Sequence, residues 1–166
     1  MVAIFDSVVC IKISGRATFV SSVDLNKLVE ELARRGEKHF VFDLTDCVMM
    51  DSTFLGVLAG IALKLCAAKD TADCQPQLLN ANPRISEVLE NLGMAHLFKS
   101  VNSKGQLTNS YEPAKSESAS QVEITRTCLE AHKLLMSIQP ENVAKFKDVA
   151  QFLSEDLKRQ ESAKTK

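Results

Sequence analysis

The residues with the clearest chemical potential are three consecutive polar side chains, Asp51, Ser52 and Thr53, which follow an apolar run. Carboxylate and hydroxyl groups are preferred at helix N-termini, where the first backbone N–H groups have no partner within the helix. The helix dipole also favours negative charge there. A phosphate on Ser52 would add roughly two negative charges and would alter any partner surface packed over it. The same chemistry fits a plain capping role for Asp51 or Ser52, and a capping residue can also accept a phosphate.

Catalytic chemistry is not indicated around these residues. The segment Met50–Phe54 does not form the G-x-S-x-G elbow of serine hydrolases. The three histidines, His39, His96 and His132, show no recognisable relation to Ser52 in the sequence. Glycine-rich phosphate loops are missing, so ATP hydrolysis is not expected. We therefore predict a protein that is not an enzyme and has no catalytic residues and no cofactor.

The cysteines do not indicate a metal site. None of them forms a C-x-x-C pair; they stand at positions 10, 47, 66, 74 and 128. Zinc sites usually show paired ligands at short spacing. We expect these cysteines to be small buried hydrophobic residues in a reducing compartment, with no bound metal.

Length and charge restrict the choice of partners. A chain of 166 residues with 45% hydrophobic residues can bury a core of its own. The net charge is −1, and both signs are mixed along the chain, which predicts no direct nucleic-acid binding. Met1–Ile13 lacks the features of a signal peptide, and the apolar window Phe54–Ala68 is interrupted by Lys64 and too short to span a bilayer. We expect a cytoplasmic protein that does not insert into a membrane.

The elements that would position Ser52 follow from hydrophobic periodicity. Val2–Phe5 and Val8–Ile13 predict a β-hairpin with its turn at Asp6 and Ser7. A polar loop at 21–24 precedes a helix that ends at Gly36. The apolar face of this helix is predicted to contain Leu25, Leu28, Val29 and Leu32.

The middle of the chain alternates strands and helices. His39–Leu44 is typical of a central buried strand, and Thr45–Met50 is predicted to be a hydrophobic loop that leads to a helix starting at Asp51–Ser52. After a polar stretch, Lys69–Gln75, the sequence predicts a strand at Gln77–Ala81. A helix then opens at Asn82-Pro83 and ends at Gly93, and residues 94–101 complete the unit as a short helix or strand.

The composition changes after Val101. Residues 102–121 are a polar linker in composition, and two amphipathic segments follow it within 122–160, separated by Pro140. We predict a C-terminal helical hairpin that packs on residues 1–101 or on a second copy of the chain; the alternative is a tail that binds nothing. The second segment carries an apolar stripe of Val143, Phe146, Ala150, Leu153 and Leu157, and the first a weaker one of Val122, Leu129, His132 and Met136.

Three segments resemble the signature of STAS domains, and in particular of the bacterial anti-sigma factor antagonists. They are Asp43–Leu44, Met50–Thr53 and Leu55–Leu58. The resemblance covers roughly residues 1–101, and it is supported by Gly15, Asn82-Pro83 and Leu92-Gly93. The chain departs from the family pattern at Thr18, where many members have an acidic residue, and at Phe54, where glycine is frequent.

The resemblance implies an α/β fold with a four- or five-stranded mixed sheet and helices packed on it, here with a C-terminal helical extension. It also implies a partner switch, in which the unphosphorylated antagonist binds an anti-sigma factor serine kinase and phosphorylation of Ser52 breaks that complex. Thr53 is the second choice of phosphoacceptor. The implied partner-binding residues are Asp51, Ser52, Thr53, Phe54 and Gly56.

Further partners are implied less directly. A phosphatase would be needed to restore the unmodified serine, and the C-terminal helices could form a homodimer. The alternative function is a STAS subunit or adaptor of a transport or signalling complex that is not phosphorylated.

Overall fold

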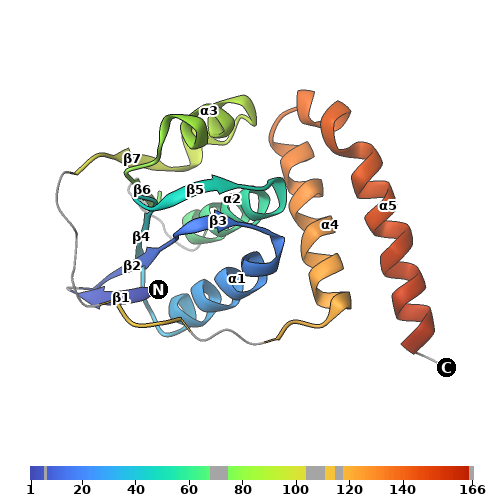
Figure 1. The fold of residues 1–166 in the computed structure, drawn as a ribbon, viewed down its shortest axis with the longest axis horizontal. Coiled ribbons are helices and arrows are strands. Elements are labelled where there is room, and N and C mark those ends of the chain that lie inside the picture. The colour runs from blue at the N-terminus through green and yellow to red at the C-terminus, as the bar shows by residue number, and fades with distance from the viewer. Residues whose placement is uncertain (6, 68–74, 104–110, 115–117, 165–166) are drawn as a thin grey trace.

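A mixed five-stranded sheet forms the centre of the computed structural model, with the strand order β1-β2-β4-β6-β7 (Figure 1). β1 runs antiparallel to β2, and the other neighbours pair in parallel. The strands are β1 (Val2–Phe5), β2 (Val8–Lys12), β4 (His39–Asp43), β6 (Gln77–Leu79) and β7 (Lys99–Val101). The predicted fold class, the N-terminal hairpin and the central position of β4 are thereby confirmed.

The structure describes residues 1–5, 7–67, 75–103, 111–114 and 118–164. Asp6 of the predicted turn and most of the predicted polar stretch Lys69–Gln75 lie outside these residues. Ser7 adopts a positive φ of 62°, as a tight hairpin turn requires. Within the described residues, no helix has the length and apolar character needed to cross a membrane.

Three helices pack on the sheet and bury the main core against it: α1 (Phe19–Arg34), α2 (Ser52–Ala67) and α3 (Pro83–Asn91). A short 3-10 helix, η1 (Ala95–Leu97), follows α3. The helix predicted to follow a polar loop at 21–24 starts earlier, at Phe19, so the loop assignment is wrong. Thr18 is the N-cap, and its backbone carbonyl accepts hydrogen bonds from the first turn, which places residues 21–24 inside the helix.

The structure also differs from the sequence prediction at Thr45–Met50, which was predicted to be a loop. Cys47–Met50 forms strand β5, which pairs in parallel with β3 (Gly15–Ala17) in a small two-stranded sheet. Cys47 and Met50 are buried and Val48 is 61% exposed, as expected for a strand at the edge of a sheet. Because β3 and β5 run side by side, the helices that follow them, α1 and α2, start next to each other.

The segment between the sheet and the C-terminal helices contacts β1. Val2 and Glu112 exchange two backbone hydrogen bonds of 2.8 Å each. The Tyr111 ring packs beside Cys10 on the sheet face opposite the main core. The division of the chain at residues 101 and 121 stays a prediction.

Two long helices complete the chain: α4 (Gln121–Ile138) and α5 (Glu141–Lys164). Figure 1 shows them side by side at one end of the domain, with α4 between α5 and the rest of the molecule. α4 packs against α1 and α2 of the same chain. The expected C-terminal helical extension is confirmed. Val143 was predicted to lie on the buried stripe but is 44% exposed, because the first turn of α5 buries Asn142 instead.

The cysteines divide into two groups. Cys10, Cys47 and Cys128 are free and buried, as predicted. Cys66 is disulfide-bonded, so the expectation that all five are simple reduced thiols is wrong at this position. Cys74 lies outside the described residues.

Candidate functional site

Asp51 fixes the geometry at the start of α2. Its carboxylate oxygen Oδ1 accepts a hydrogen bond from the backbone N–H of Phe54 at 2.8 Å, and its backbone carbonyl accepts one from Leu55. Asp51 is therefore the N-cap of α2. Its second oxygen, Oδ2, accepts from the backbone N–H of Phe19 at 2.7 Å, at the first residue of α1. The sequence allowed either Asp51 or Ser52 as the cap; the structure shows Asp51 in this role, and the Ser52 hydroxyl takes no part in capping α2.

The Ser52 hydroxyl contacts the C-terminal extension. Its Oγ lies 2.9 Å from Nε2 of His132 on α4. The other ring nitrogen, Nδ1, lies 2.7 Å from the carbonyl oxygen of Cys128, one turn earlier on the same helix. A carbonyl can only accept, so Nδ1 carries a proton; in the neutral imidazole, Nε2 then accepts the Ser52 proton. The expectation that His132 is unrelated to Ser52 is wrong.

The remaining predicted partner-binding residues are buried. Thr53 and Phe54 are 5% and 2% exposed, and Gly56 is buried where α2 passes α4. Ser52 is half-buried. In this state, the five residues do not form an open surface, because α4 covers part of it.

The pKa of Cys128 reflects the surroundings of the contact between α2 and α4. Burial raises the pKa of the Cys128 thiol; the hydrogen bond with the Thr53 side chain acts in the opposite direction, and the nearby Asp51 carboxylate raises it further. The thiol is therefore neutral at physiological pH and packs as a small hydrophobic group. Thr53 and Ser52 thus contact two residues of α4 that lie one helical turn apart.

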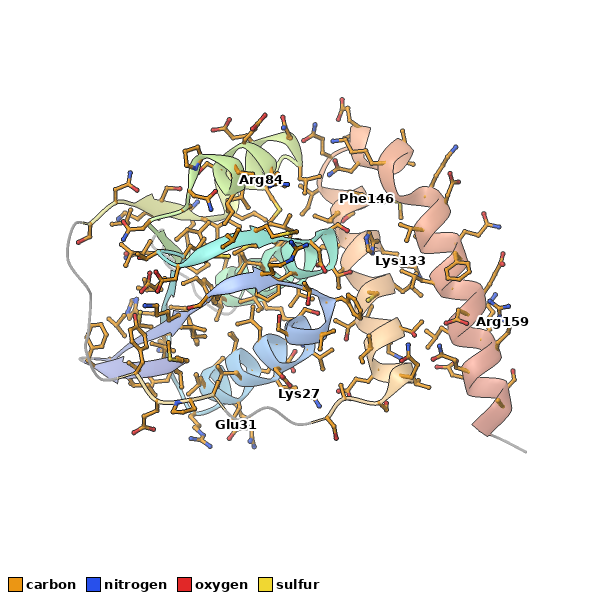
Figure 2. All side chains as sticks on the ribbon, viewed as in Figure 1. Lys27, Glu31, Arg84, Lys133, Phe146 and Arg159 are labelled. Atoms are coloured by element: carbon orange, nitrogen blue, oxygen red, sulfur yellow. The ribbon has the colours of Figure 1, made fainter. Side chains whose placement is uncertain are left out.

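The serine–histidine pair has the separation of an activated nucleophile, but its surroundings do not suit acyl transfer. His132 is 5% exposed, and the ring of Phe146 from α5 lies against it at 5.2 Å between centroids. Figure 2 labels Phe146 near the turn that joins α4 and α5. A tetrahedral intermediate also needs free N–H donors for its oxyanion, and the N–H of Phe54 is already bound to Asp51. The arrangement is suited to holding a helix against the serine.

The role of His132 could not be found from spacing, because 80 positions separate it from Ser52. One signal was available. His132 stands in the apolar stripe of the first C-terminal segment, and a histidine on a buried helix face requires a polar partner. His39 and His96 are exposed and do not contribute to this contact.

The sequence model of the STAS domain family matches residues 1–107, and the chain therefore belongs to this family. A comparison with curated proteins gives no significant match. Among solved structures, the chain is similar to the phosphorylated form of the Bacillus cell fate determinant SpoIIAA, with 16% identity, coverage of 61% of this chain and 89% of that chain, and a TM-score of 0.50. The unphosphorylated anti-sigma factor antagonist SpoIIAA matches with 17% identity, coverage of 54% and 80%, and a TM-score of 0.47. At this identity the likeness concerns the fold. α4 and α5 lie beyond the matched family domain.

Proposed function

We propose that this chain is a partner-switching regulator of the anti-sigma factor antagonist type. In this proposal it binds an anti-sigma factor serine kinase through the surface around Ser52, and phosphorylation of Ser52 ends the binding. The kinase supplies the catalysis, and a phosphatase restores the unmodified serine. Membership of the STAS family and the SpoIIAA-like fold support the class of function.

The observation that carries the proposal is that Asp51 caps α2, whereas the hydroxyl of the neighbouring Ser52 does not. Asp51 makes the capping hydrogen bonds of α2, so modification of the Ser52 hydroxyl would leave the helix start intact. A phosphate at this position would also lie at a helix N-terminus, which favours negative charge. Ser52 is favoured over Thr53, since Thr53 is only 5% exposed whereas Ser52 is half-buried.

The first test maps the modified residue. The protein is incubated with ATP and an anti-sigma factor kinase chosen from the gene neighbourhood, and the phosphorylated peptide is sequenced by mass spectrometry. We expect a single phosphate on Ser52 in the wild type and in Thr53→Val, and none in Ser52→Ala. Modification confined to other residues would contradict the proposal.

The second test measures binding to the same kinase by calorimetry. Ser52→Asp is expected to weaken binding, because a new charge in a packed interface is costly unless a cation meets it. Ser52→Ala is expected to bind at least as tightly as the wild type. Equal affinities of Ser52→Asp and Ser52→Ala would show that charge at this position does not control the partner.

A second candidate function is supported by the position of α4, which covers Ser52. Ser52 is bonded to His132 beneath α4, as expected for a STAS subunit or adaptor whose serine is a structural contact and is not phosphorylated. For such a protein, Ser52 would stay unmodified with any kinase, and the partner would bind Ser52→Asp and the wild type equally.

A further inference from the structure

The face of α2 that carries Ser52 is occupied by α4 of the same chain. The Ser52 hydroxyl lies within hydrogen-bond distance of His132, and the Thr53 side chain interacts with the Cys128 thiol; His132 and Cys128 lie on the side of α4 that faces α2. One turn further along α2, Gly56 meets Ala131. Along α2, polar contacts with α4 at Ser52 and Thr53 are followed by close packing at Gly56. All three residues were predicted to bind a partner.

The fit at Gly56 is specific for a closely packed helix. A Cβ at Gly56 would stand 2.6 Å from the carbonyl oxygen of Ala131, which is backbone and cannot turn aside. At Gly60, one turn later, a Cβ would meet only a terminal methyl group of Leu134, at 3.3 Å. α2 therefore has a notch at Gly56 in which a small residue of the covering helix must lie.

We propose that the α4–α5 hairpin is an intrachain competitor for the partner surface of α2. It closes over Ser52, and both partner binding and phosphorylation of Ser52 require its release. This inference rests on the proposed function and adds the regulation of that site. A partner that replaces α4 would present a helix with a small residue at the notch.

The hairpin is held more firmly at its turn than at the start of α4, which suits release from the start of α4. At the turn between the helices, the fully buried Asn142 side chain donates to the carbonyl oxygens of Leu92 and Leu135, at 3.0 and 2.8 Å. At the other end, α4 is joined to α1 by the solvent-exposed ion pair of Lys27 and Glu123, at 2.9 Å. Exposed ion pairs contribute little stability.

Between these ends, an open groove borders the contact of α4 with α2. A groove of about 240 Å³ that is open to solvent lies between α1, α2 and α4, beside Gly56, Gly60 and Leu134. Side chains that line an open groove face solvent on one side and lack dispersion contacts with a packed neighbour there. The α2–α4 contact therefore combines a close approach at Gly56 with an open groove next to it, and in the proposed release α4 would separate from α2 while the turn near Asn142 stays attached.

The first experiment opens the hairpin from the side of α4, so that the STAS surface is unchanged. In the full chain, Ala131→Leu places a larger side chain against Gly56, and Ala144→Leu makes the same change at an exposed position of α5. The readout is the rate at which maleimide modifies the free, buried Cys128 thiol, followed by peptide mass spectrometry. We expect that rate to rise by about tenfold or more in Ala131→Leu, because overpacking disfavours the closed state, and to change less than about twofold in Ala144→Leu.

The second pair of variants acts from the other side of the same contact. Gly56→Ala brings a Cβ against the Ala131 backbone, and Gly60→Ala makes the same change where a side chain can yield. Both substitutions raise the helix propensity of α2, so loss of the helix does not explain a difference between them. Gly56→Ala is expected to increase Cys128 labelling and Gly60→Ala to leave it near the wild-type rate. Circular dichroism on all four variants verifies that the domain is folded.

The same variants are then phosphorylated with the kinase used above. Ser52 phosphorylation is expected to rise in Ala131→Leu by a factor similar to the rise in thiol labelling. Equal phosphorylation rates in the wild type and Ala131→Leu, with labelling increased, would overturn the competitor role and leave the proposed function intact. Unchanged labelling in both Ala131→Leu and Gly56→Ala would also overturn it. No phosphorylation of Ser52 in any variant, despite increased labelling, would instead remove the proposed function itself.

Discussion

The Asp51 carboxylate lies 2.7 Å from the backbone nitrogen of Phe19, so one side chain connects the starts of two helices. Its other oxygen caps α2 at Phe54. β3 and β5 bring these two helix starts together, and Asp51 satisfies an N–H group at each of them. This carboxylate belongs to the structural frame that holds Ser52 in place.

We expect Asp51→Ala to lower the free energy of unfolding by about 1–3 kcal/mol, because it removes two capping hydrogen bonds. Asp51→Asn keeps one acceptor oxygen and should give an intermediate value. Urea denaturation of the three proteins measures the difference. Equal stability of Asp51→Ala and the wild type would show that the two bonds are not used in solution.

A second prediction concerns Asn142 at the turn between α4 and α5. Asn142→Ala leaves the carbonyl groups of Leu92 and Leu135 without this donor, which is expected to cost about 1–3 kcal/mol of unfolding free energy. The neighbouring Val143→Ala, at an exposed position, should stay within about 0.5 kcal/mol of the wild type. Thermal and urea denaturation of both variants test this, and equal losses would contradict the anchoring role of Asn142.

Two phenylalanines of α5 provide a matched pair. Phe146 packs against the core and the ring of His132, whereas Phe152 is 60% exposed. Phe146→Ala should lower the free energy of unfolding by about 1–3 kcal/mol, since half-buried apolar area is lost. Phe152→Ala should change it by less than about 0.5 kcal/mol. A larger loss for Phe152→Ala would place the buried face of α5 on its other side.

The fourth prediction is a pH dependence at Asp43, at the end of β4. Burial alone would raise the pKa of Asp43, but hydrogen bonds from Thr45 and Tyr111, with Lys12 nearby, outweigh it and hold the pKa below its ordinary value. Stability gained from the ionised form is present above the unfolded-state pKa of about 3.9 and is lost as the pH falls through the lower folded-state pKa.

Tyr111→Phe removes the hydroxyl that donates to the Asp43 carboxylate at 3.0 Å. The pKa of Asp43 should therefore rise, and acid unfolding should begin at a higher pH than in the wild type. An NMR titration of the Asp43 carboxyl in both proteins measures the shift. An unchanged pKa in Tyr111→Phe would falsify the assignment of this hydrogen bond.

Local periodicity was sufficient for much of the fold. Alternation and caps predicted the β1–β2 hairpin, the strand β4 and the helix that opens at Asn82-Pro83, because each is specified by neighbouring residues. Strand β5 was missed because Cys47–Met50 is short and its partner, β3, has only three residues. Its pairing depends on contacts between segments distant in sequence.

The site was predictable only in its local part. Asp51 and Ser52 could be placed at a helix start because capping is a property of adjacent residues. His132 joins them only through the packing of α4 on α2, and a helix stripe does not specify which surface it will cover. The exposed position of Val143 has a similar cause, since the turn at Pro140 sets which residue of the first turn of α5 points inward.

The backbone bridge between Val2 and Glu112 has a consequence for competition. Only residues 113–120 connect this attachment point to α4, and at about 3.3–3.6 Å per residue they reach no farther than about 30 Å. A released hairpin would therefore remain at an effective concentration on the order of millimolar near α2. A separate protein that binds the same face competes with the hairpin. To displace it, the product of that protein's concentration and its affinity must exceed the product of the hairpin's effective concentration and its own affinity. In the proposed competition, the bridge at β1 would set a threshold that excludes weak or scarce ligands, and lengthening the tether would lower that threshold.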